Sequence, residues 1–174
     1  MRTDWLAACS AAIFAASAAH GANCSVSVPD LNFGNYDPIS SNLANPLDGA
    51  TTLTVACQGT LIGLQETINV TISLSSGSGT GAGSYNPRQM QGAASGDKLN
   101  YNLYWDSART QVAGNNTAGT FKRSDSAQVA CHLLFLLCDS TTFIETIHGR
   151  VFGGQDVGVG AYATTIPITV SVSF

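Results

Sequence analysis

Few residues of this chain have the type and the spacing that catalysis requires. His132 and His148 stand at no metal-ligand spacing, and the sequence has no Gly-x-Ser-x-Gly elbow. The glycine-rich stretch 77–83 departs from a dinucleotide-binding pattern at Ala82 and Ser84. The carboxylates are scattered singly, which suits solvation and turns better than acid and base work: Asp97, Asp106, Asp125, Asp139, Glu145 and Asp156. The sequence therefore predicts no enzyme, no catalytic residue, no cofactor and no metal site.

The cysteines are the residues whose chemistry the sequence does predict. If Cys9 leaves with an N-terminal export signal, an even number remains, as disulfides in an oxidising compartment require: Cys24, Cys57, Cys131 and Cys138. Three connectivities are possible. The pairs Cys24–Cys57 and Cys131–Cys138 are favoured, because each brackets a hairpin or a crossing between sheets. A zinc site is the rival interpretation, but the sequence has no Cys-x-x-Cys pair.

The segment between Cys131 and Cys138 differs from the rest of the chain. It contains five consecutive large apolar residues: Leu133, Leu134, Phe135, Leu136 and Leu137. One hypothesis is a strand buried on both faces, for which a continuous apolar run is typical. The other is a disulfide-closed hairpin tip that presents these side chains to a surface or a partner. Burial is favoured because exposure of so much apolar area invites aggregation, and both hypotheses stay open.

Length, charge and the N-terminal segment limit the classes of function. A chain of 174 residues fits one domain, and 7 basic against 11 acidic residues give a net charge of −4, which excludes a nucleic-acid-binding surface. Residues 1–21 have the basic start, the apolar stretch and the small residues of a cleaved secretory signal. Residues 22–174 are then the exported domain, and none of its segments has the length of a membrane span.

Alternation of apolar and polar residues predicts the elements that position these side chains. It is clearest over residues 52–57, 67–74, 99–105 and 166–174, and weaker over 24–28 and 143–152. Loops rich in Gly, Ser, Ala and Asn separate these segments at 75–84, 91–97 and 114–119. The pattern predicts an all-β fold, an antiparallel β-sandwich of immunoglobulin-like type.

Several short motifs, in their order and spacing, resemble the spore coat protein U domain family, which includes the Csu-type pilins of archaic chaperone-usher pili. The first group follows Cys24 and comprises Phe33, Gly34, Tyr36, Pro38, Arg88, Met90, Tyr101, Asn102 and Tyr104. The closing group comprises Gly149, Arg150, Gln155, Gly160 and Tyr162. The resemblance covers residues 24–112 and 149–174. Departures from the family pattern are His148, Thr164 and the segment 112–114.

The resemblance implies an incomplete sandwich that lacks one strand. The groove left by the missing strand is apolar and bordered by unpaired backbone groups. In the family, a periplasmic chaperone fills this groove first, and a strand from a neighbouring pilus subunit replaces it, so that chaperone, usher and neighbouring subunit are the implied partners. The implied location is the periplasm in transit and then the cell surface.

The same resemblance sets an expectation about position in a fibre. A donor strand needs roughly ten residues ahead of the domain, but the expected cleavage site leaves at most residues 20–23 before Cys24. The chain is therefore expected to accept a strand and hardly to donate one, which suits a pilus tip in contact with abiotic or host surfaces. The prediction is a secreted structural subunit of a chaperone-usher pilus or surface coat. The alternatives are a free secreted surface-binding domain and a small secreted hydrolase.

Overall fold

The protein is described by a computed structural model that covers residues 7–13, 22–60, 65–77, 84–93, 95–132 and 137–174. These residues contain strands and no helix, so the all-β prediction is confirmed. The strands are β1 (Ala7–Ile13), β2 (Ala22–Ser27), β3 (Leu31–Gly34), β4 (Leu47–Gly59), β5 (Gln65–Leu74), β6 (Arg88–Gly92), β7 (Lys98–Tyr104), β8 (Arg123–His132), β9 (Leu137–Cys138), β10 (Ser140–Val151) and β11 (Tyr162–Ser173).

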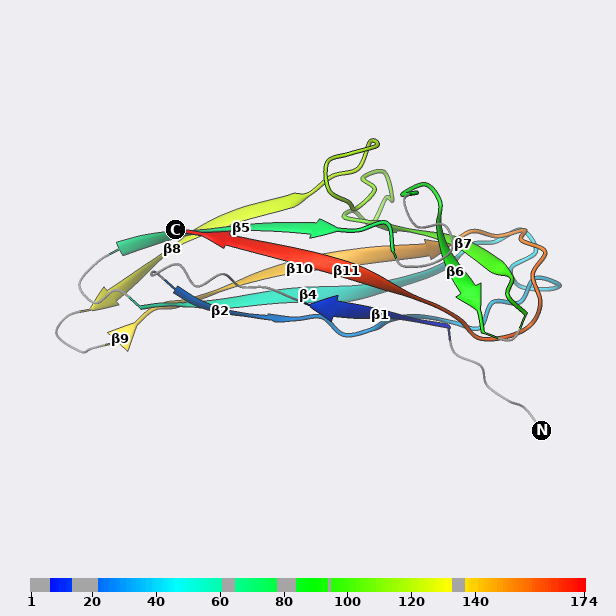
Figure 1. Ribbon diagram of the computed structural model, residues 1–174, viewed down its shortest axis with the longest axis horizontal. Helices are drawn as coiled ribbons and strands as arrows, with labels where there is room; N and C mark the ends of the chain where they lie inside the picture. Colours follow the sequence, from blue (N-terminus) through cyan, green and yellow to red (C-terminus); the bar gives the residue numbers. More distant parts are fainter. Residues whose placement is uncertain (1–6, 14–21, 61–64, 78–83, 94, 133–136) are drawn as a thin grey trace.

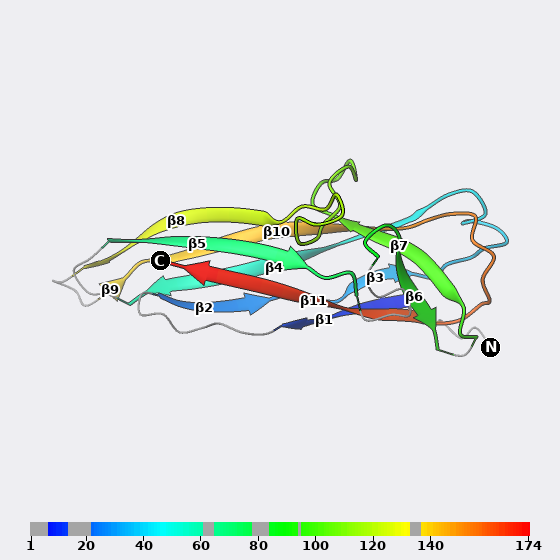
Figure 2. The ribbon, with the colours of Figure 1, turned by 45° about the horizontal axis from the view of Figure 1, so that its top comes forward.

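The strands form a continuous sheet in the order β2-β4-β10-β7-β6-β11-β5-β8-β9, with β1 paired to β11 and β3 paired to β1 (Figures 1 and 2). Among the named strands of the described residues, all pairings are antiparallel except that of β1 with β11. Inward residues of β4 and β10 share one core with those of β5 and β11. The sheet is therefore folded over on itself, while the immunoglobulin-like strand arrangement remains a prediction.

The alternation seen in the sequence has its physical counterpart in the burial of these strands. In β5, Ile68, Val70 and Ile72 are at most 2% exposed, while the residues between them face outward or are half-buried. The same period of two places Ile166 and Ile168 of β11 in the core. Full burial of such a side chain contributes roughly 1.5–3 kcal/mol. The period-two pattern therefore reports the core correctly.

The molecule is elongated, and its two ends are different (Figures 1 and 2). One end carries the loop 35–46 between β3 and β4 and the loop 152–161 between β10 and β11. The opposite end carries the start of β2, the β8–β9 hairpin and the C-terminus. Of the two strands that border β1, β3 runs toward the loop end and β11 runs away from it.

Five of the described strands lie outside the segments that alternation predicted: β1, β3, β6, β8 and β9. β8 escapes notice because Ser124, Asp125 and Ser126 are all exposed, so its first half has no apolar face. The loop predicted at 91–97 begins inside β6. In the part of the chain that the structure describes, no helix is long and apolar enough to cross a membrane.

Candidate functional site

The most distinctive site is the strand position between β3 and β11, which β1 occupies (Figure 2). Residues 8–13 run parallel to residues 163–168 of β11. On its other side β1 pairs antiparallel with β3, from Cys9 opposite Leu31 to Ala7 opposite Gly34. We call this position, bordered by β3 and by residues 163–168 of β11, the strand site. Its occupant β1 lies inside the segment 1–21 that the sequence predicts to be a signal.

The floor of the strand site is apolar. Leu31 and Phe33 of β3 are both 4% exposed, and Ile166 and Ile168 of β11 are also buried. An apolar cavity reaches from this floor into the core, lined by Val28, Pro29, Leu31, Thr51, Leu74, Leu103, Ile147, Ile166 and Ile168. No charged residue is among these lining residues. A strand in this position is therefore matched to apolar side chains on its inward face.

The register defines which positions of an occupying strand meet the floor. The buried residues Thr164, Ile166 and Ile168 of β11 have Cys9, Ala11 and Ile13 as their partners in β1. Directly paired residues of neighbouring strands lie on the same face of a sheet. Every second position of the occupant, starting at that of Cys9, is therefore the position that selects for size and polarity.

The strand site continues beyond the end of β1. β1 ends opposite Ile168, whereas β11 extends to Ser173. On this side of β11, residues 169–173 have no paired strand among the described residues. Val170 is 9% exposed, and Val172 packs partly buried against the core. The apolar floor is therefore longer than β1.

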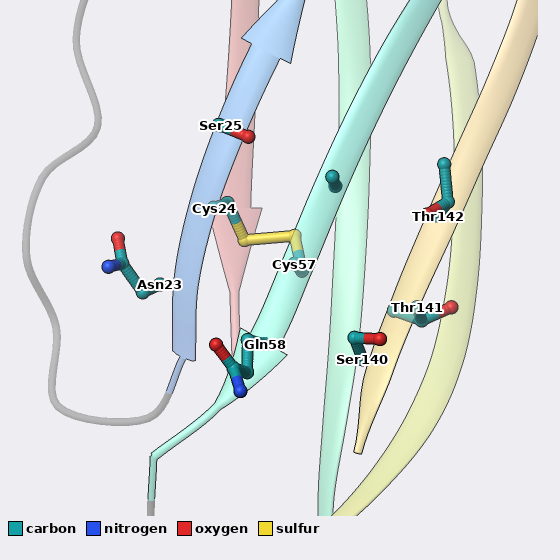
Figure 3. Close-up of a pocket in the computed structure, with 9 residues that line it drawn as sticks. Asn23, Cys24, Ser25, Cys57, Gln58, Ser140, Thr141 and Thr142 are labelled. Atoms are coloured by element: carbon teal, nitrogen blue, oxygen red, sulfur yellow. A yellow bond between two sulfur atoms is a disulfide. The ribbon is translucent and has the colours of Figure 1, made fainter. Parts of the chain in front are cut away.

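Both predicted disulfides are present. Cys24 of β2 and Cys57 of β4 face each other in register and are bonded, as Figure 3 shows. Cys131 of β8 is bonded to Cys138 of β9, its partner in the two-residue pairing. The favoured connectivity is therefore confirmed, and it fits an extracytoplasmic protein.

Of the apolar run 133–137, the structure describes only Leu137. Leu137 lies in β9 and is 66% exposed, which agrees with the hairpin-tip hypothesis at that residue. Leu133, Leu134, Phe135 and Leu136 lie outside the described residues, so the choice between burial and exposure stays a prediction for them. The hairpin itself is at the end of the molecule opposite the loops.

A shallow polar depression lies beside the first disulfide, on the outer face of β2, β4 and β10 (Figure 3). It is lined by Asn23, Cys24, Ser25, Ala56, Cys57, Gln58, Ser140, Thr141 and Thr142. These residues supply hydroxyl and amide groups without a charge, an aromatic ring or a free thiol. The depression therefore brings together no ionisable side chain that could act as an acid or a base, and its Ser and Thr hydroxyls have no such group among the lining residues to activate them.

Arg88 is the most deeply buried charged residue of the family-motif set. It is 0% exposed, and its guanidinium donates to Asn102 Oδ1 at 2.6 Å and to the backbone oxygens of Ala113 at 2.6 Å and Ser75 at 3.0 Å. Its guanidinium carbon also lies 5.0 Å from the ring centre of Tyr85. Arg88 therefore joins three chain segments, and its role is structural.

A second motif group supports β3, one border of the strand site. The rings of Phe33 and Tyr101 meet edge to face with centroids 6.1 Å apart. A Cβ at Gly149 would lie 2.5 Å from the Phe33 ring, so this position has no room for a side chain. Met90 is buried in the same core, at 0% exposed. The motif residues thus fix the floor and border of the site.

The closing motif ties the loop end together. Gln155 accepts the Asn100 backbone N–H at 2.6 Å and donates its side-chain amide to the backbone oxygens of Asn100 and Phe152. Its own backbone N–H donates to the Tyr36 hydroxyl at 3.0 Å. The Tyr162 hydroxyl donates to the backbone oxygen of Gly158. Gly34 has a φ of 78°, a left-handed conformation that favours glycine, where β3 ends.

Sequence reasoning missed a surface ion cluster that involves the motif residue Arg150. Arg150 donates to both carboxylate oxygens of Asp48, at 2.7 and 2.8 Å, and Arg109 Nη2 lies 3.0 Å from the same carboxylate. The hydrogen bond from Arg150 lowers the pKa of Asp48, against the opposing effect of burial. Burial raises the pKa of the neighbouring Tyr104. The partners are far apart in sequence, so no local pattern signals this cluster.

The candidate histidines His132 and His148 lie apart from each other. His132 Nε2 lies 3.8 Å from Asp139 Oδ1 beside the second disulfide, while His148 is on β10, opposite Tyr104. Over the described ranges, no three of the residues His, Cys, Asp and Glu are grouped as a metal site requires.

Comparison with known proteins gives one consistent result. The chain matches the Spore Coat Protein U domain family over residues 10–169. It is also 33% identical over 144 residues to Protein U of Myxococcus xanthus, an alignment that covers 81% of this chain and 70% of that protein.

Proposed function

We propose that this chain, which belongs to the Spore Coat Protein U domain family, is an exported subunit that assembles by accepting a β-strand from another protein at the strand site. The family consists of structural coat and pilus domains and is not an enzyme family. Its membership and the two disulfides agree with a subunit of a surface coat or pilus. The assembly route is the proposal.

One observation carries this proposal. The strand between β3 and β11 comes from residues 7–13, which lie within the expected signal 1–21. Cleavage after residue 21 would remove it and leave the facing edges of β3 and β11 without a partner over an apolar floor. Unpaired backbone groups and exposed apolar side chains both cost free energy. The mature domain would therefore require a strand supplied by a second chain.

The chemistry of the floor supports a protein strand as the occupant. Backbone N–H and C=O groups along both borders need hydrogen-bond partners in extended register, which a β-strand provides. The buried residues Leu31, Phe33, Ile166 and Ile168 need apolar side chains above them. We therefore assign a periplasmic chaperone as the first occupant and a neighbouring subunit, delivered at an usher, as the final one.

A position at the fibre tip is a further part of the proposal. It is supported by the exposed Leu137 beside the Cys131–Cys138 disulfide, at the end away from the loops. In such a position the hairpin would contact abiotic or host surfaces through apolar side chains.

The test compares the chain with and without residues 1–21. Residues 22–174 are produced alone and with a synthetic peptide of residues 7–20, and both are compared with residues 1–174 by thermal unfolding and size-exclusion chromatography. We expect residues 22–174 alone to unfold at a lower temperature or to self-associate. The peptide should restore a one-to-one complex, whereas the same peptide with Ser10→Pro, which removes a backbone donor, should not.

A different result would contradict the proposal. If residues 22–174 were a monomer as stable as residues 1–174 and bound neither the peptide nor a co-expressed pilus chaperone, the domain would be complete without a partner strand. The protein would then act as a free surface-binding domain.

A further inference from the structure

We infer that the loop end of the molecule is a second contact surface for the subunit that supplies the strand. This inference rests on the proposed function, since it concerns the body of the same partner. Three exposed apolar side chains carry it: Ile39 at 81%, Leu43 at 63% and Val159 at 80% exposed. We call these three residues the loop-end patch. Such side chains gathered at one place mark an interaction surface.

The loop-end patch borders a concave surface. Pro38, Ile39 and Leu43 from the loop 35–46 face Val157 and Val159 from the loop 152–161 across a groove of about 440 Å³. Asp156 is the one charged residue among its lining residues. The surface therefore suits an apolar, uncharged part of a partner.

Hydrogen bonds hold both loops in place. Asn42, at 4% exposed, accepts the Asp37 backbone N–H at 2.9 Å and donates its side-chain amide to the backbone oxygen of Asn45. The backbone N–H of Gly154 donates to the backbone oxygen of Asn42 at 2.9 Å, which joins one loop to the other. A partner would therefore meet a preformed surface, which reduces the entropy lost on binding.

The loop-end patch is continuous with the strand site. The loop 35–46 follows directly after β3, and the loop 152–161 leads directly into β11, and these are the two strands that border the site. Figure 2 shows both loops beyond the same end of β1. A chain that leaves the strand site at this end emerges beside the two loops that carry the loop-end patch.

The direction of head-to-tail repetition identifies the part of the partner subunit that would contact the loop-end patch. In the proposed assembly the donor strand precedes β2, and β2 begins at the end of the molecule opposite the loops. For subunits of one family to repeat in one direction, the β2-start end of the donor must meet the loop end of the acceptor, with the donor strand antiparallel to β11. In this fold the β2-start end also exposes apolar groups, Leu137 at 66% and Phe174 at 41%. The occupant is therefore the apolar end of the next subunit.

The experiment separates this contact from strand acceptance. The triple variant Ile39→Ser, Leu43→Ser, Val159→Ser is compared with Ile144→Ser, which removes an apolar side chain of similar exposure, 65%, from the outer face of β10. Circular dichroism and thermal unfolding establish that both variants fold. Binding of the 7–20 peptide to residues 22–174 is measured for each, and assembled material is recovered from the surface of cells that express each full chain.

We expect the triple variant to bind the peptide as the unaltered chain does, but to yield at least fivefold less assembled material, while Ile144→Ser yields a normal amount. Normal assembly by the triple variant would overturn the inference. If that variant assembled normally but attached less to polystyrene, the loop-end patch would be an adhesive surface and not a contact between subunits. Failure of the unaltered chain to bind the peptide would instead contradict the proposed function.

Discussion

At the scale of single residues, Arg88 stabilises the fold by donating hydrogen bonds to acceptors on three separate chain segments. Its guanidinium binds Asn102, Ala113 and Ser75, on three separate segments, while it is 0% exposed. A buried acceptor left without a donor costs roughly 1–3 kcal/mol. We expect Arg88→Met to lower the free energy of unfolding by about 3 kcal/mol or more, measured by urea denaturation.

Arg88→Lys is the informative companion to that variant. Lysine keeps the charge but has a single ammonium group, which cannot reach acceptors on three segments in the geometry of a guanidinium. We expect it to recover part of the loss, not all of it. Equal stability of the Met variant and the unaltered chain would show that the network contributes nothing.

Asp48 provides a pH-dependent prediction. The hydrogen bond from Arg150 lowers the pKa of Asp48, so the ionised carboxylate stabilises the folded state above its unfolded pKa of about 4. This contribution is lost as the pH falls through the lower folded pKa. We expect Asp48→Asn to unfold at a lower temperature than the unaltered chain at pH 7, and the difference to shrink steadily below about pH 4. A difference that stayed constant to pH 2 would contradict the ion-pair explanation.

Residue types were more predictable than residue partners. The sequence indicated the cysteine pairs because export makes their oxidation expected and each pair brackets a short structural unit. The sequence did not indicate the role of Asn42 or the Asp48–Arg150 pair. A surface carboxylate is expected to be solvated, and only the fold places Arg150 Nε 2.7 Å from Asp48 Oδ1. Long-range polar contacts of this kind follow from the fold and cannot be read before it.

At the scale of elements, the two disulfides close loops of different length and should differ in what they contribute. Cys24 and Cys57 are 33 positions apart, and Cys131 and Cys138 are 7 apart. Loop-closure entropy then assigns about 4 and about 2.5 kcal/mol to the two bonds. We expect the double replacement Cys24→Ser, Cys57→Ser to lower the free energy of unfolding more than Cys131→Ser, Cys138→Ser does, as measured by urea denaturation. The opposite order would show that native contacts, not loop length, determine the difference.

Strands were predictable from the sequence where one face is buried and the other is exposed to solvent. β5 and β11 alternate because each has the core on one side and solvent on the other. β8 was not predicted because the first half of the strand has no buried side chain. β3 was not predicted because four residues are too few to show a period. Our proposal identifies the strand expected to be missing with β1, whose residues 7–13 lie in the expected signal segment.

At the scale of the whole molecule, β1 has a smaller residue than β11 at one paired position of the strand site. The register partner of the buried Ile166 in β1 is Ala11, and an apolar cavity lined by Ile166, Ile168 and Leu31 lies at this level of the core. A strand with a larger apolar residue at this position would share the face of Ile166 and bury more apolar area beside it. A dedicated partner strand should therefore carry such a residue there.

The 7–20 peptide makes this prediction measurable. Replacing Ala11 of the peptide by Val adds two methyl groups at the position opposite Ile166, which we expect to tighten its binding to residues 22–174 about tenfold, because burial of each group contributes about 0.8 kcal/mol. The same replacement at Ala12, opposite the exposed Pro167, is the control and should change the affinity little. Isothermal titration calorimetry gives both dissociation constants. Equal gains at the two positions would mean that binding follows general hydrophobicity, and the assignment of the inward register would be wrong.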